Sequence, residues 1–166
     1  MASEIQRLYM GSAAANTATS PGSVYTVPSN KRTIIKSVVV FNNSSSEQRF
    51  TISLAGYPII YNHVIKPFDT MLLPAAGFIL NPIESLSFGC TSTIALTVSG
   101  VVIDATERNN PYIFARANGL GTLSTSNQVR DTANNILIKS VTFCNVTGTD
   151  TTIALSINGS SLMGSK

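Results

Sequence analysis

Charged residues are scarce in this sequence, which also contains no tryptophan, one histidine and two cysteines. Asp, Glu, Lys and Arg together make up 11% of the 166 residues, against about 25% in an ordinary soluble domain. A monomer exposed on all sides generally carries more charge, because surface charge keeps it soluble. The low charge therefore predicts a protein whose outer faces meet neighbours in a permanent assembly. The competing explanation is an ordinary β-domain whose surface is rich in Ser and Thr.

The few ionisable side chains are also too scattered for most chemistry. The eight acids form no close pair flanked by apolar residues, which is the arrangement that general acid–base catalysis uses. His63 has no acid near it in the sequence, and together with Cys90 and Cys144 it supplies too few ligands for a zinc site. The sequence therefore predicts a protein that is not an enzyme and that uses no cofactor and no metal.

The basic residues and the apolar runs argue against two further classes of partner. The eleven Lys and Arg residues are dispersed, and their densest group is the pair Lys31 and Arg32, so we expect no nucleic-acid binding. The longest apolar runs are far shorter than a membrane span, so we expect no membrane association. Residues 1–11, MASEIQRLYMG, carry Glu4 and Arg7 where a signal peptide would be apolar. We therefore expect the chain to be made in the cytoplasm.

The sequence does contain an internal repeat, around which the rest of the chain is organised. Residues 33–56, TIIKSVVVFNNSSSEQRFTISLAG, align without a gap with residues 136–159, ILIKSVTFCNVTGTDTTIALSING, at a shift of 103 positions. Each segment has the pattern of a strand, a polar loop and a second strand, which predicts a duplicated β-hairpin. The residues expected to form the core of the repeated hairpin are Val38, Val40, Phe50, Ile52, Leu54, Val141, Phe143, Ile153, Leu155 and Ile157.

The remaining sequence favours an all-β fold. No stretch shows a sustained apolar period of 3.6 residues, whereas short strands bounded by turn signals recur about every eight to twelve residues. We predict an antiparallel β-sandwich, Ig-like or jelly-roll-like, with a second, partial copy of the same module. Residues 1–104 form the sandwich, with residues 11–22 as a loop or extended arm. Residues 105–111 form a linker, and residues 112–166 form the partial second module.

The second copy is short of strands. The first copy continues from Tyr57 to Asp104 after its hairpin, whereas the chain stops soon after the second hairpin. Half a sandwich leaves an apolar face and unpaired strand edges, which are unstable in isolation. Either the chain is the front of a longer protein, or neighbouring chains complete the second unit by exchanging strands. Both alternatives stay open.

Residues 25–56, YTVPSNKRTIIKSVVVFNNSSSEQRFTISLAG, followed by IIYNHVIKPFDTMLL, ILNPIESLSF and TVSGVVID, carry a resemblance. This run resembles a β-sandwich module of virion proteins of tailed bacteriophages, found in tail, fibre, baseplate or head-decoration components. The motif is a Val-Pro-x-Asn turn at residues 27–30, placed before the strand at residues 34–38. The second copy departs from it, because Arg130 and Asp131 replace Val27 and Pro28.

The resemblance covers residues 25 to about 104, and it implies a non-enzymatic structural component of a bacteriophage virion. Such a head-decoration, fibre or tail accessory protein would bind other virion proteins and form a homo-oligomer. For attachment we expect the N-terminal segment to Gly22 and the incomplete second copy. The alternative function is recognition of a host cell-surface saccharide, with Tyr57 and Tyr61 as the contacts, because exposed aromatic side chains combine an apolar body with a polar handle.

Overall fold

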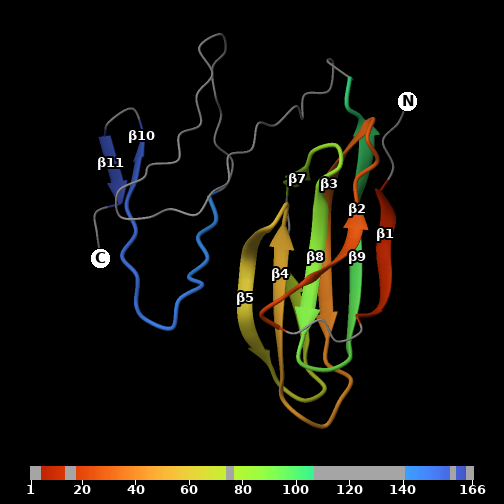
Figure 1. The fold of residues 1–166 in the computed structure, drawn as a ribbon, viewed down its shortest axis with the longest axis vertical. Helices are drawn as coiled ribbons and strands as arrows, with labels where there is room; N and C mark the ends of the chain where they lie inside the picture. The colour runs from red at the N-terminus through yellow and green to blue at the C-terminus, as the bar shows by residue number, and fades with distance from the viewer. Residues whose placement is uncertain (1–4, 14–17, 74–76, 107–140, 158–159, 164–166) are drawn as a thin grey trace.

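The computed structural model describes residues 5–13, 18–73, 77–106, 141–157 and 160–163. Within these ranges the regular structure is β-strand, in eleven strands β1 to β11. Nine of them form two antiparallel sheets, of five and four strands, that lie face to face (Figure 1). The prediction of an all-β fold with antiparallel sheets is therefore confirmed.

The five-stranded sheet has the order β1–β9–β3–β6. The short strand β7 pairs with residues 33–35 of β3, on the same edge of β3 as β6. The long central strand β3 is dense in β-branched residues, which favour the extended conformation. A register shift between Ile35 and Ser37 changes the alternation, so that Ile35 before it and Val38 and Val40 after it are all buried. The strands are β1 (Ile5–Ala13), β9 (Ile94–Asp104), β3 (Lys31–Phe41), β6 (Thr70–Leu73) and β7 (Phe78–Leu80).

The four-stranded sheet has the order β2–β8–β4–β5 and faces the first sheet across the core. Phe50 from β4 stacks on Phe88 from β8 with ring centroids 5.9 Å apart, and Ile52 and Leu54 continue the same buried side of β4. The strands are β2 (Gly22–Thr26), β8 (Ser85–Cys90), β4 (Gln48–Leu54) and β5 (Tyr57–Ile65). Val38, Val40, Phe50, Ile52 and Leu54, the core residues expected from the first copy of the repeat, are thus all buried.

The prediction of a β-hairpin over residues 33–56 is wrong in its connectivity. Strands β3 and β4 lie in different sheets, so the segment is a β-arch that crosses from one layer to the other. The physical reason is that the apolar sides of both strands must face each other across the core, which neighbouring strands of one sheet cannot do. Asn42, buried in the connecting loop, holds the crossing through hydrogen bonds from its Nδ2 to the carbonyl oxygens of Ser46 (2.8 Å) and Lys66 (2.9 Å).

The N-terminal segment is not a free arm in the part that the structure describes. Strand β1 pairs antiparallel with β9 along its whole length. Further on, Ala18 is buried, and its carbonyl oxygen accepts a hydrogen bond from the Thr51 hydroxyl on the outward side of β4. Within the predicted loop or arm at residues 11–22, residues 11–13 thus belong to β1, Gly22 begins β2, and residues 18–21 form no strand. The use of this segment for attachment stays a prediction.

The C-terminal residues differ from the expected second hairpin. Residues 141–154 contain no strand, and β10 (Leu155–Ile157) pairs with β11 (Ser160–Met163) in a separate two-stranded sheet. Val141 and Phe143, expected in a core, are 47% and 46% exposed, because no described strand pairs with them. Ile153 and Leu155 are half-buried. The side chain of Ile157, the start of the second repeat at residues 136–140 and most of the 105–111 linker lie outside the described residues.

Candidate functional site

The outer face of the five-stranded sheet carries an uncharged row of side chains that crosses four strands. Leu72 on β6 is the register partner of Val39, Val39 is the partner of Thr97 on β9, and Thr97 is the partner of Met10 on β1. Val38 and Val40 point into the core, so Val39 and its partners point away from it. The two ends of the row are open to solvent: Leu72 is 62% exposed and Met10 is 65% exposed. We call these four residues the outer row.

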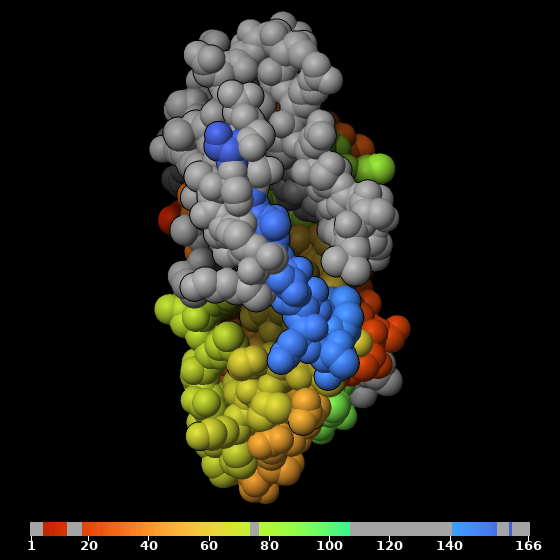
Figure 2. Space-filling model, turned by 90° about the vertical axis from the view of Figure 1, so that its left-hand side faces the viewer, coloured from red at the N-terminus to blue at the C-terminus, as the bar shows by residue number. Residues whose placement is uncertain are grey.

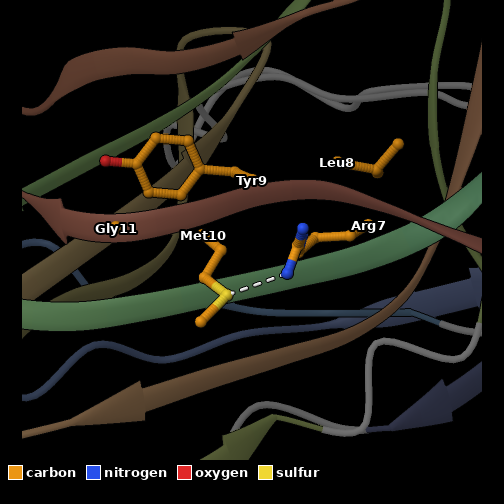
Figure 3. Close-up of a pocket in the computed structure, with 5 residues that line it drawn as sticks. All are labelled: Arg7, Leu8, Tyr9, Met10 and Gly11. Carbon is orange, nitrogen blue, oxygen red and sulfur yellow. Dashed lines mark hydrogen bonds between the residues drawn. The ribbon is translucent and has the colours of Figure 1, made fainter.

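Strand β1 shapes one end of the outer row. Its register with β9 shifts between Arg7 and Tyr9, and this irregularity places Arg7 and Met10 on the same side of the strand. Figure 3 shows the Tyr9 ring on the opposite side, where it packs against the core. The Arg7 guanidinium lies 3.1 Å from the Met10 sulfur and lines an open depression with Leu8 and Gly11. The depression is a surface feature that borders the outer row.

Two proline turns display further apolar side chains. Phe68 follows Pro67 between β5 and β6, and Ile83 follows Pro82 between β7 and β8. Their φ angles are +56° and +64°, and they are 65% and 74% exposed. Both turns close with a backbone hydrogen bond of the type II pattern, in which Gly or Asn usually takes this position. A bulky residue there strains the backbone by about 1–2 kcal/mol, so each turn exposes an apolar side chain at a cost in stability.

The edges of the two sheets are poorly suited to pairing with another chain. Strand β5 contains Pro58, two register shifts against β4, and Asn62 at a φ of +47°. Strands β1 and β2 each carry a register shift, and β6 and β7 are four and three residues long. Short strands, bulges and prolines are the devices by which natural sheets prevent edge-to-edge association. Contacts with other chains are therefore expected at the faces and turns of the sandwich rather than at its edges.

The loop of the second repeat reproduces the hydrogen bonds of the first. In each loop an asparagine Oδ1 accepts from the backbone N–H and the hydroxyl of the residue two positions on, and its Nδ2 donates to the carbonyl oxygen four positions on at 2.8 Å. The first loop is formed by Asn42 with Ser44 and Ser46, and the second by Asn145 with Thr147 and Thr149.

The strand pairing that follows the loop is also reproduced. The pairing of β10 with β11 matches the start of the β4–β5 pairing when each position is shifted by 103, and the register irregularity falls at the same place. The matched pairs are Leu54 with Tyr57, Ser53 with Pro58 and Ile52 with Ile60 in the sandwich, and Ile157 with Ser160, Ser156 with Ser161 and Leu155 with Met163 near the C-terminus. The described residues 141–150 lie at the surface, outside both large sheets (Figure 2).

The residues considered for saccharide binding lie on the edge strand β5, where Tyr57 and Tyr61 are both half-buried. Two register shifts between β4 and β5 fall within this strand, so the simple alternation that would place both rings on one face does not hold. The rings of His63 and Phe50 form a T-shaped pair with their centroids 5.6 Å apart, so His63 lies beside the core. Saccharide binding by Tyr57 and Tyr61 therefore stays a prediction.

The thiols and the acids of the described residues form no reactive cluster. Burial raises the pKa of the Cys90 thiol above its ordinary value, and it also raises the pKa of the Cys144 thiol, so both favour the protonated and less reactive form. Asp104 pairs with Lys31 at 2.5 Å and ties the end of β9 to the start of β3. Among the described residues, no three His, Cys, Asp or Glu side chains are grouped so that they could hold a metal ion.

Comparisons with protein-family models, with curated proteins and with solved structures find no match to this chain. Within the described residues, no helix of the length and apolarity needed to cross a membrane is present.

Neither the outer row nor the two strained turns was predicted from the sequence. The apolar pattern of β3 gives no sign of the row, because Val39 alternates with core residues in a strand that is apolar on both sides. A signal for the turns was present: the pattern Pro, bulky apolar residue, acid occurs at residues 67–69 and again at residues 82–84. Proline favours the second position of a type II turn, so the pattern placed Phe68 and Ile83 at the positive-φ position.

Proposed function

We propose that this chain is a non-enzymatic structural component of a bacteriophage virion, a head-decoration, fibre or tail accessory protein that acts through protein–protein assembly. The observation that carries the proposal is the outer row, which runs uncharged across four strands and is open to solvent at Met10 and Leu72. The low charge of the whole chain and the resemblance of residues 25–104 support the same function.

The outer row has the chemistry of a docking surface for another virion protein. Apolar side chains such as Leu72 and Met10 release about 2 kcal/mol each when a partner removes them from water. The flanking positions Ser37 and Ser99 are joined by a hydrogen bond of 2.7 Å between their hydroxyls, and the row that they form ends in the charged side chain of Arg7 on β1. A stable interface buries on the order of 1,000 Å² or more, and a face of four paired strands provides a flat area for it.

Phe68 and Ile83 expose two further apolar side chains, in turns at the two ends of the sandwich: the Phe68 N–H donates to the Ser44 carbonyl, and the Ile83 N–H donates to the Val27 carbonyl. A strained residue that persists at a solvent-exposed position is often retained for binding. Phe68 lies in the turn after β5, next to the start of β6, and Ile83 lies in the turn after β7. We propose that both side chains are contact points for neighbouring virion proteins.

The organisation that we propose for the chain is a sandwich module over residues 1–104, a linker over 105–111 and a partial second copy over 112–166. The matching loops at Asn42 and Asn145, and the matching registers of β4–β5 and β10–β11, support a common origin of the two segments. Both matches occur at the shift that aligns the two sequences.

The proposal is tested with particles that lack the chain. Purified wild-type protein is added to such particles and co-sedimented with them, in parallel with Leu72→Lys and with Thr93→Lys, an exposed position on the turn between β8 and β9 that is not part of the outer row. We expect the wild type and Thr93→Lys to co-sediment and Leu72→Lys to bind at least tenfold more weakly. Failure of the wild type to bind any phage particle contradicts the proposed function, and equal binding of Leu72→Lys contradicts the outer row as the contact.

A further inference from the structure

Residues 141–154 repeat a part of the sandwich that is fully paired there. Their counterparts in the first copy lie in β3, which is flanked by β9 on one side and by β6 and β7 on the other, and in β4, which is flanked by β8 and β5. The two strands of such an arch belong to different sheets, so they cannot satisfy each other's backbone hydrogen bonds. An arch of this sequence therefore needs neighbouring strands from elsewhere.

One of the neighbours is already in place in the second copy. Strand β11 stands beside β10 in the register in which β5 stands beside β4. No described strand of the chain takes the places that β8, β9 and β6 take in the sandwich, and the first-copy strands themselves are already paired. The loop at Asn145 and the β10–β11 hairpin are thus already formed in the second copy, whereas residues 141–144 and 150–154 pair with no described strand.

From this arrangement we infer that residues 141–154 form β-sheet with the same segment of a second copy of this chain. Each copy contributes one β-arch, and the two arches lie side by side so that each sheet gains a strand from each copy. Val141 and Phe143, about half exposed in the single chain, become covered in the pair.

The composition of the segment favours a second copy over another partner. Residues 141–163 contain a single charged side chain, Asp150, so identical segments can lie next to each other without rows of like charge. Symmetric homo-oligomers are the commonest form of soluble assembly.

The sandwich itself is a poor occupant of the second arch. Its edge strands carry the irregularities at Pro58 and Asn62, the register shifts of β1 and β2, and the short strands β6 and β7. Residues 141–154 contain no proline and carry none of these irregularities of the sandwich edges. This pairing of two copies is inferred for the chain itself, so it does not depend on the proposed function in a virion.

The test measures the mass of the full chain in solution by light scattering and sedimentation, for the wild type, Phe143→Lys and Leu72→Lys. We expect the wild type to have a mass that is a multiple of 17.6 kDa. We expect Phe143→Lys to lose the oligomer and fall to the mass of one chain, because a charge enters the paired face of the arch. Leu72→Lys, on the outer row of the sandwich, should keep the oligomer.

Three further measurements make this result specific to the arch. Thermal unfolding of the sandwich should be unchanged in Phe143→Lys, and Ala154→Pro, which removes a backbone N–H from the second strand of the arch, should also lose the oligomer. In the wild type the amides of residues 143–154 should exchange slowly, and in Phe143→Lys they should exchange fast. A wild type with the mass of one chain, or an oligomer that survives Phe143→Lys, overturns the inference. Either result leaves the binding of the outer row to phage particles as a separate question.

Discussion

Asn42 and Asn145 make the same hydrogen bonds in two loops that lie 103 positions apart, but only Asn42 is buried. The Nδ2 of Asn42 reaches beyond its own loop to the carbonyl oxygen of Lys66 at 2.9 Å, and Asn145 is exposed. The same loop structure is therefore buried in the sandwich at Asn42 and exposed to solvent at Asn145. The difference in burial between the two asparagines can be tested directly.

We predict that Asn42→Asp lowers the free energy of unfolding by about 3 kcal/mol or more, because it removes the hydrogen bonds that Nδ2 donates to the carbonyl oxygens of Ser46, Ile65 and Lys66 and buries a carboxylate against them. Asn145→Asp is the matched control. It should change the free energy of unfolding by less than about 0.5 kcal/mol, since its side chain is solvated. Urea unfolding measures both values. Equal losses in the two variants would show that burial at Asn42 is not what makes it important.

Gly100 is a position at which the sheet admits no side chain. A Cβ atom there would lie 2.5 Å from the carbonyl oxygen of Ile34 and 2.8 Å from a methyl carbon of Leu8. We predict that Gly100→Ala lowers the free energy of unfolding by about 2 kcal/mol, because a backbone atom cannot move aside without disturbing the β3–β9 pairing. Gly148→Ala, where nothing lies within 4 Å, should be neutral in the same denaturation experiment. A neutral Gly100→Ala would contradict the close approach of the two strands.

Phe50 is the central aromatic residue of the core. It is fully buried, stacks on Phe88 and receives the edge of the His63 ring. We predict that Phe50→Ala lowers the free energy of unfolding by about 4 kcal/mol through the lost transfer energy and the remaining cavity. Leu72→Ala, at an exposed position, should cost less than about 0.5 kcal/mol. Calorimetry of both variants checks the contrast, and similar melting temperatures would show that the core is not where we place it.

The strained turns allow stability and binding to be separated. We predict that Ile83→Asn raises the free energy of unfolding by about 1 kcal/mol, because Asn tolerates a positive φ that a β-branched residue does not. The same change should weaken co-sedimentation with phage particles. Leu72→Asn, at a position where no positive φ is relieved, should weaken co-sedimentation without a gain in stability. An Ile83→Asn variant that is stabilised and binds normally would remove this turn from the contact surface.

The sequence predicted the fold class well, and it predicted the connections less well. Alternating apolar residues in β4 correctly placed Phe50, Ile52 and Leu54 in the core, because the two-residue period reports which side faces it. The other side of β4 was expected to face outward, but Thr51 and Ser53 are buried as well. The same pattern does not report which sheet a strand joins, so the sequence predicts a hairpin where the structure has an arch of β3 and β4. Residues 11–22 looked like an arm because small polar residues give no period, although β1 and Ala18 belong to the sandwich.

The candidate surfaces depended on information that no local pattern carries. The outer row exists because four strands that are distant in the sequence meet in one register, and this register is a property of the folded sheet. The exposure of Val141 and Phe143 likewise follows from which strands are present beside them. The sign of φ at Phe68 and Ile83 was within reach of the sequence, since each follows a proline in a turn.

The most direct measurement of the central proposal is hydroxyl-radical footprinting of Met10 and Leu72, on the purified chain and on phage particles that contain it. Both side chains are largely exposed in the single chain, so they should be oxidised readily there. We predict that their oxidation falls at least fivefold in the particle while that of buried Phe88 stays low in both samples. Equal oxidation of Met10 and Leu72 in the free chain and in the particle would contradict the proposal that the outer row binds a neighbour.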